Sequence, residues 1–150
     1  MHHKLLLIYC HMIRIIFILL PDMPLTMRFR GFLYSLAMKK CGKNFQVSSS
    51  AVLRGIEKIC CGSNVYIGPN AYVMARESII IHDEVLVAMN VVIVDGNHGK
   101  IDNSYRFGRG NQIQIVIGKG AWIAANSVVT AGSNILPGSI VPPCTVVRKS

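Results

Sequence analysis

The stretch IGKGAWIAANSVVTAGSNILPGSIVPPCTVV (117–147) repeats one pattern every six residues. An aliphatic residue opens each hexad, at Ile117, Ile123, Val129, Ile135, Val141 and Val147. Neither a helix nor a strand has this period, because side chains recur on one face every ~3.6 residues in a helix and every ~2 in a strand. A period of six suits one short strand followed by one tight turn. The stretch therefore predicts a solenoid of stacked coils.

The same frame continues upstream with two interruptions. The fourth position of a hexad is mostly Asn or Gly, which enter the left-handed backbone region at a corner with little strain. An antiparallel sandwich would instead show alternation of period two, without recurrent Asn or Gly at one position. We therefore expect an all-β fold, a parallel β-helix over residues 46–150 with three hexads in each coil. Upstream hexads begin at Cys61, Ile67 and Val73 and, after a slip of two residues, at Ile81, Val87 and Ile93.

Composition limits the classes of protein to consider. The 150 residues are enough for one domain, and 51% of them are hydrophobic while only 15% are charged. Because a narrow prism has a small core, we expect homo-oligomerisation to cover part of the remaining apolar surface. The net charge of +9 suits anionic partners such as coenzyme phosphates, a phosphorylated lipid or a membrane surface. Nucleic acid is not expected, because the repeats carry no basic stripe with interleaved aromatic residues.

The five cysteines are an odd number and show neither metal-binding nor disulfide spacing. We interpret them as reduced thiols, and therefore expect a cytoplasmic protein without a metal site. A catalytic thiol remains an alternative.

Residues 1–45 are predicted to form a separate helical and basic segment. The run LLLIYCHMIRIIFILL (5–20) is apolar but shorter than the roughly 20 residues that a membrane-spanning helix needs. In MRFRGFLYSLAMKKCGK (27–43), basic residues are interspersed with large apolar ones. Two interpretations of residues 5–43 stay open. Either they lie on the inner face of a membrane as a basic amphipathic segment, or they pack against the open end of the prism.

Between Ile93 and Ile117 the six-residue frame lapses, and residues 94–116 form a polar, Gly-rich excursion. Loops held by a rigid scaffold often carry function. His98 lies in this excursion, three residues after Asp95. Because a neutral imidazole takes up and returns a proton near neutral pH, His98 is the candidate general base. Asp95 is close enough in sequence to orient the imidazole.

Two stretches beside the excursion resemble a known family. IIIHDEVLVAMNVVIVDGNHG (79–99) and IVIGKGAWIAANSVVTAGS (115–133) resemble the hexapeptide-repeat acyltransferases, and within them the galactoside, maltose and capsule or O-antigen acetyltransferases. The resemblance covers roughly residues 40–147. It implies a left-handed parallel β-helix, a homotrimer with active sites between subunits, and acetyl-CoA as co-substrate. The implied acceptor is a hydroxyl of a sugar or glycan.

The resemblance also implies roles for individual residues. His98 falls on the catalytic histidine of the family, and Trp122 on a tryptophan that lines the acceptor or pantetheine channel. Asn70 falls on an active-site asparagine, although a corner position accounts for this residue equally well. The backbone at Ala124 and Ala125 would contact the coenzyme or an oxyanion. The remaining candidates are Tyr105, Arg106 and Arg109 for the acceptor, and Arg148 and Lys149 for coenzyme phosphates.

Two alternatives to an acetyltransferase remain. The tail VPPCTVVRKS (141–150) lacks the Gly-x-Pro segment that usually follows the last coil in this family, which keeps a non-catalytic trimeric scaffold or truncated pseudoenzyme open. A γ-type carbonic anhydrase shares the fold, but its zinc site needs one more histidine than His82 and His98, and the repeats contain no other.

Overall fold

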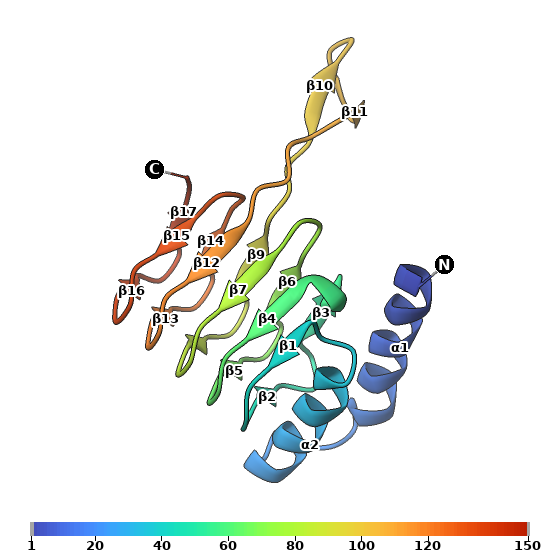
Figure 1. Cartoon of the computed structure of the whole chain (residues 1–150), viewed down its shortest axis with the longest axis vertical. Helices are drawn as coiled ribbons and strands as arrows, with labels where there is room; N and C mark the ends of the chain where they lie inside the picture. The colour runs from blue at the N-terminus through green and yellow to red at the C-terminus, as the bar shows by residue number, and fades with distance from the viewer. Residues whose placement is uncertain (1, 150) are drawn as a thin grey trace.

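The computed structural model describes residues 2–149, so residues 1 and 150, the outer ends of the two predicted segments, lie outside the described chain. The chain forms a prism of stacked coils with two helices at one end and a hairpin that projects from one corner (Figure 1). The predicted all-β parallel β-helix with an N-terminal helical segment is thus confirmed.

Each flat side of the prism is a parallel sheet of five strands among the described residues. Each coil contributes one strand to each side, so strands of successive coils lie next to one another. The first sheet contains β1 (Lys40–Cys41), β4 (Ile59–Cys61), β7 (Ile79–Ile81), β12 (Ile115–Ile117) and β15 (Asn134–Ile135). The second contains β2 (Gln46–Val47), β5 (Tyr66–Ile67), β8 (Leu86–Val87), β13 (Trp122–Ile123) and β16 (Ile140–Val141). The third contains β3 (Val52–Arg54), β6 (Tyr72–Met74), β9 (Val92–Val94), β14 (Val128–Val129) and β17 (Val146–Val147).

The residues that open the hexads form columns in the core. In the second sheet Ile67 pairs with Val87, which pairs with Ile123, and all three are fully buried. Adjacent coils lie at the usual inter-strand spacing of roughly 4.8 Å, so each side chain packs directly on the equivalent one of the next coil. Burial of one such aliphatic side chain stabilises the fold by about 1.5–3 kcal/mol. The six-residue frame therefore predicts the central columns of the core, to which buried residues of the helices and of other strand positions are added.

The corners have the predicted left-handed backbone. Asn70 and Asn90 have φ of 55° and 57°, and Gly120 has 68°. Glu84 adopts the same conformation with φ of 62°, at a cost of about 1–2 kcal/mol for a residue other than Gly or Asn. The fourth-position residues Arg76 and Gly96 depart from this rule, and they flank the two places where the frame is interrupted.

The β-helix begins earlier than predicted. Strand β1 pairs with β4, with Cys41 opposite Cys61, so a first coil starts inside the segment 1–45 that was predicted to be helical. Its corner residue Asn44 has φ of 55°, like the later corners. The frame was hard to find here because Cys41 opens the hexad in place of Ile or Val. The boundary predicted at residue 45 therefore moves to the connection between α2 (Pro24–Ser35) and β1.

Helices α1 (His2–Phe17) and α2 (Pro24–Ser35) pack against the first coil, and a short 3₁₀ helix, η1 (Ile56–Lys58), follows β3. From α1, Cys10, Ile13 and Phe17 are buried, and Tyr34 of α2 is buried beside them. This arrangement agrees with the predicted packing on the open end of the prism, yet the opposite faces of both helices stay exposed. Within residues 2–149, no helix combines the length and apolarity that crossing a membrane requires.

A polar link joins the helices to the first coil. The fully buried Arg30 donates to the Asp22 carboxylate at 3.0 Å and to the Val47 carbonyl. Asp22 also accepts from the Ser48 hydroxyl and, at 2.8 Å, from the Ser49 N–H. Burial alone would raise the pKa of Asp22, but these hydrogen bonds and the Arg30 guanidinium hold that pKa below its usual value of 3.8. The link is thus complete above the usual pKa and is lost as pH falls through the lowered one.

Replacing Asp22 with Ala should lower the free energy of unfolding by about 3 kcal/mol, because it leaves the Arg30 charge buried without its carboxylate. The Nε and Nη2 atoms of Arg30 already have no acceptor among the described residues. Chemical denaturation measures the effect, with Glu77→Ala, which removes an exposed carboxylate, as the control. Equal stability of the two variants would contradict the link.

Candidate functional site

The polar excursion is an antiparallel hairpin of β10 (Gly99–Ile101) and β11 (Ser104–Gly108), which leaves the prism after β9 and returns at β12 (Figure 1). Hydrogen bonds fix its base. The Asn97 N–H donates to the Asn111 carbonyl at 3.0 Å, and the Asn111 N–H donates to Asn97 Oδ1 at 2.7 Å. A Cβ on Gly110 would lie 1.6 Å from the Asn97 carbonyl oxygen, so glycine permits this close approach. The backbone at Asn97, directly before His98, is therefore fixed by its hydrogen bonds with Asn111 and by its close contact with Gly110.

His98 is exposed and lines a cavity of about 400 Å³ at the base of the hairpin. No acidic residue lines this cavity, and its three arginines form no ion pair within residues 2–149. The cavity thus combines a candidate base with cationic walls, which suits a ligand that carries both a hydroxyl and a negative charge. The other lining residues are Arg76, Asn97, Arg106, Gly108, Arg109, Gly110 and Gln112.

Arg76 was missing from the predicted site residues. It belongs to the preceding coil, and its Cδ atom lies 3.3 Å from where a Cβ on Gly96 would be. The two residues occupy the same hexad position twenty residues apart, so they stack on each other. That spacing is the signal by which Arg76 could have been found.

Asp95 does not pair with His98 among the described contacts, contrary to the sequence-based expectation. Its buried carboxylate accepts backbone N–H groups from Arg76 at 2.7 Å and from Glu77 and Ser78 at 2.8 Å each. Both carboxylate oxygens are occupied in this way. Asp95 therefore stabilises the backbone where the preceding coil contains two extra residues. This place adjoins the start of the hairpin that carries His98.

Trp122 and Asn70 do not line the His98 cavity. Trp122 points outward from β13 on the second side of the prism and is 44% exposed, between Leu86 and Ile140 on the neighbouring coils. Asn70 turns the corner between β5 and β6, and its N–H donates to Ser50 Oγ at 3.0 Å. Their contact with a ligand bound at His98 remains a prediction that requires a second subunit.

The other predicted contacts lie at separate places. The Ala124 N–H donates to the Val141 carbonyl at 3.0 Å, whereas no acceptor for the Ala125 N–H is found in the described chain, which leaves that donor available. Tyr105 is exposed on β11, with the Lys100 ammonium 6.0 Å from the centre of its ring. Arg148 and Lys149 are exposed at the end of the last coil. The ligand roles of all five predicted residues, Ala124, Ala125, Tyr105, Arg148 and Lys149, remain predictions.

Thiol chemistry is disfavoured at three of the cysteines. Burial raises the pKa of the Cys10 and Cys41 thiols to about 11 and the pKa of Cys61 well above its usual value. Such thiols stay protonated near neutral pH and are weak nucleophiles. Among residues 2–149, no group of three or more His, Cys, Asp or Glu side chains is placed to hold a metal ion.

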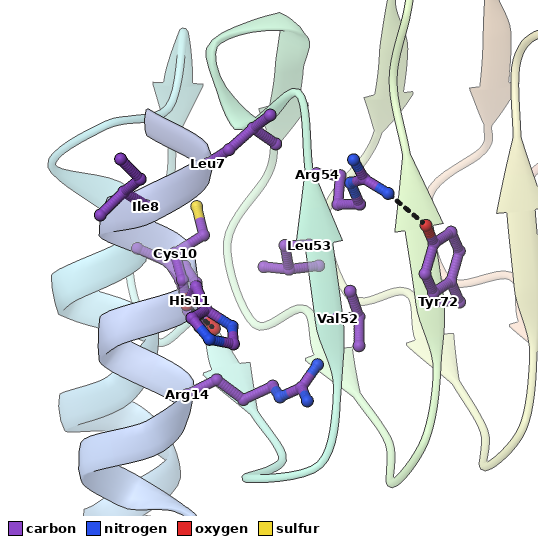
Figure 2. A pocket seen from close by; sticks show the side chains of 10 residues that line it. Leu7, Ile8, Cys10, His11, Arg14, Val52, Leu53, Arg54 and Tyr72 are labelled. Atoms are coloured by element: carbon purple, nitrogen blue, oxygen red, sulfur yellow. Dashed lines mark hydrogen bonds between the residues drawn. The ribbon is translucent and has the colours of Figure 1, made fainter. Parts of the chain in front are cut away.

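A larger cavity lies apart from this site, near the N-terminal helices. It measures about 500 Å³ and lies between α1 and the third side of the prism, with Leu7, Ile8 and Leu53 in its lining (Figure 2). Its lining is mostly apolar, in contrast to the polar His98 cavity. Arg14 and Arg54 also line it.

Replacing Asp95 with Ala should destabilise the protein by roughly 3 kcal/mol, because three partly buried backbone N–H groups lose their acceptor. Thermal or chemical denaturation measures this loss. Glu84→Ala, which removes an exposed carboxylate at another corner, is the control. Full stability with greatly reduced turnover would instead identify Asp95 as the partner of His98.

Comparison with known proteins agrees with this fold. The protein-family model named "hexapeptide repeat of succinyl-transferase" matches residues 59–94. A colanic acid biosynthesis acetyltransferase of Escherichia coli K12, WcaF, is 26% identical over 123 residues, which cover 82% of this chain and 66% of WcaF. A lipopolysaccharide biosynthesis O-acetyl transferase of the same strain, WbbJ, is 30% identical over 106 residues, 65% of this chain and 53% of WbbJ. The chain thus spans no more than about two thirds of either relative.

A solved structure shows the same fold along nearly the whole chain. The hexapeptide-repeat acetyltransferase of Vibrio cholerae O1 biovar eltor, in complex with acetyl coenzyme A, superposes with a TM-score of 0.79 at 19% identity. The alignment covers 97% of this chain and 78% of that protein. The chain is a left-handed parallel β-helix of hexapeptide repeats, and it resembles the hexapeptide-repeat acyltransferases and, among them, the sugar and polysaccharide O-acetyltransferases.

Proposed function

We propose that the protein transfers an acetyl group from acetyl-CoA to a hydroxyl of a sugar or surface-polysaccharide precursor, with His98 as general base. The observation that carries the proposal is the exposed imidazole of His98 in a cavity whose other ionisable residues are arginines. The names of WcaF and WbbJ support a polysaccharide acceptor, and the acetyl-CoA complex of the Vibrio cholerae protein supports the donor.

The chemistry needs one group that takes up a proton and returns it. The imidazole of His98 accepts the proton of the acceptor hydroxyl, whose oxygen attacks the thioester carbon of acetyl-CoA. The C–S bond then breaks, and the imidazolium returns the proton to the departing thiolate of coenzyme A. An N–H donor such as that of Ala125 would stabilise the oxyanion, a contribution of roughly 2.7–4 kcal/mol. General-base catalysis contributes about 10²–10⁴-fold.

We further propose that the active form is a homotrimer with its sites between subunits. Within one chain, His98 lies at the corner after the third sheet, whereas Trp122 lies on the second sheet. Because these are different sides of the prism, one chain cannot enclose a ligand between them. A cyclic assembly places one side of a protomer against a different side of its neighbour and so completes the site. We place this trimer in the cytoplasm, where its cysteines stay reduced.

Replacing His98 with Ala should lower kcat/KM for acetyl transfer by about 10²–10⁴-fold, because the acceptor hydroxyl loses its base. Release of free coenzyme A thiol in the presence of glycan acceptors measures the rate. His82→Ala is a matched control, since His82 is also exposed but does not line the cavity.

Equal turnover by His98→Ala and the native chain would eliminate His98 as the base. Calorimetric titration with acetyl-CoA tests the remaining alternative. A native chain that binds no acetyl-CoA would contradict the transferase and favour the non-catalytic scaffold.

The three arginines around His98 predict an anionic group on one substrate. Arg106→Gln and Arg109→Gln should each raise the KM for that substrate by about 10-fold or more, because a charge-assisted hydrogen bond is lost. A higher KM for acetyl-CoA assigns the arginines to coenzyme phosphates, and a higher KM for an acidic sugar assigns them to the acceptor. Lys119→Gln, a cation on another coil, is the control. Unchanged KM values for both substrates would contradict the prediction.

A further inference from the structure

The two N-terminal helices expose apolar residues on the side that faces away from the prism. Residues of α1 at spacings of three and four, on one helical face, are between 48% and 60% exposed. Residues of α2 and its C-cap repeat this spacing and are between 53% and 75% exposed. The residues are Leu5, Ile8, Met12 and Ile15 in the first helix, and Leu25, Phe29, Phe32 and Leu36 in the second.

We call these two stripes together the helical apolar face. The ring of Phe29, in the second stripe, lies 5.7 Å from the ring of the buried Phe17, so α1 and α2 are in contact. The connection between the helices adds exposed Ile18, Leu20 and Leu19, the last of which is 91% exposed. A helix that is apolar on opposite sides is normally covered on both. The prism covers only one side of α1 and α2, so the helical apolar face has the properties of a docking surface.

The charge around this face identifies the partner. Residues 1–43 contain seven basic residues (Lys4, Arg14, Arg28, Arg30, Lys39, Lys40 and Lys43) and one acidic residue, Asp22, a balance of 7 − 1 = +6. Arg30 and Asp22 neutralise each other, which leaves six cations. A second copy of the chain would bring the same positive charge to the interface and be repelled. An anionic bilayer offers the opposite charge together with an apolar interior.

The groove beside α1 places two cations next to the helical apolar face, Arg14, which is one of these six, and Arg54 of β3. Figure 2 shows Arg14 extending from α1 toward β3, and Arg54 extending from β3 toward Tyr72, whose hydroxyl it contacts at 3.2 Å. Neither arginine forms an ion pair in the part of the chain that the structure describes. Ile8 belongs both to this groove and to the exposed stripe, so the cations and the apolar face adjoin.

We propose that the protein docks on anionic membranes through the helical apolar face, with Arg14 and Arg54 binding phosphates of phospholipid headgroups. The apolar stripes of α1 and α2 enter the boundary between headgroups and acyl chains, and the prism remains outside. Docking is independent of acetyl transfer and would hold a transferase close to membrane-bound acceptors.

Sedimentation of the full chain with vesicles tests the proposal. We expect binding to vesicles of equal amounts of phosphatidylcholine and phosphatidylglycerol, little binding to phosphatidylcholine alone, and weaker binding at high salt. Phe29→Ser and Arg14→Gln should each weaken binding to the anionic vesicles by about tenfold or more. Leu136→Ser and Lys119→Gln change an exposed apolar residue and an exposed cation far from the helices and should bind like the native chain.

Three results would overturn the proposal. The first is equal binding to neutral and anionic vesicles, and the second is no binding to either. The third is that Phe29→Ser leaves vesicle binding unchanged but reduces the size of the assembly in solution, which would make the face an interface between copies of the chain. Circular dichroism of each variant verifies that it is folded. Because vesicle binding needs no substrate, its outcome is independent of the proposed acetyl transfer.

Discussion

The in-register stacking of inward aliphatic side chains is the constraint on which the rest of the structure depends. Ile67, Val87 and Ile123 lie directly above one another, so each coil must keep three short sides of nearly equal length. Left-handed corners at residues such as Asn70 and Asn90 make those sides possible. Extra residues therefore cannot be absorbed within a side and must leave at a corner. The hairpin that follows β9 is such an insertion, and it carries His98 on a base fixed by the prism.

The same constraint explains why Asp95 is buried next to a candidate base without contacting it. The slip of two residues in the preceding coil leaves three N–H groups that no parallel neighbour satisfies, and the Asp95 carboxylate accepts all three. Arg76 begins this slip and extends into the His98 cavity. The irregularities of two successive coils thus converge at one corner. There the scaffold is least regular and most polar, which is where a proton-transfer site can form without disturbing the core columns.

Sequence periodicity predicted the core and most corners, because both depend on residues six apart. Periodicity did not reveal the contacts between successive coils, because the residues in contact are about twenty positions apart in the sequence. Asp95 looked like a partner for His98 because the two are close in sequence, but its partners lie in the coil before. Arg76 was missed for the same reason. The first coil was hidden because Cys41 replaces an aliphatic residue. The N-terminal helices were ambiguous because they are apolar on opposite sides, and a pattern of apolar residues does not reveal which side packs on the prism.

A crystal structure of the protein with coenzyme A and a glycan acceptor is the most direct test of the central claim, that His98 activates an acceptor hydroxyl in a cleft between subunits. We expect a hydroxyl of the acceptor within about 3 Å of the imidazole of one protomer. We also expect the coenzyme sulfur beside that hydroxyl, with Trp122 of the neighbouring protomer at the ligand. A coenzyme sulfur bound away from His98, or an acceptor site enclosed by a single chain, would contradict it.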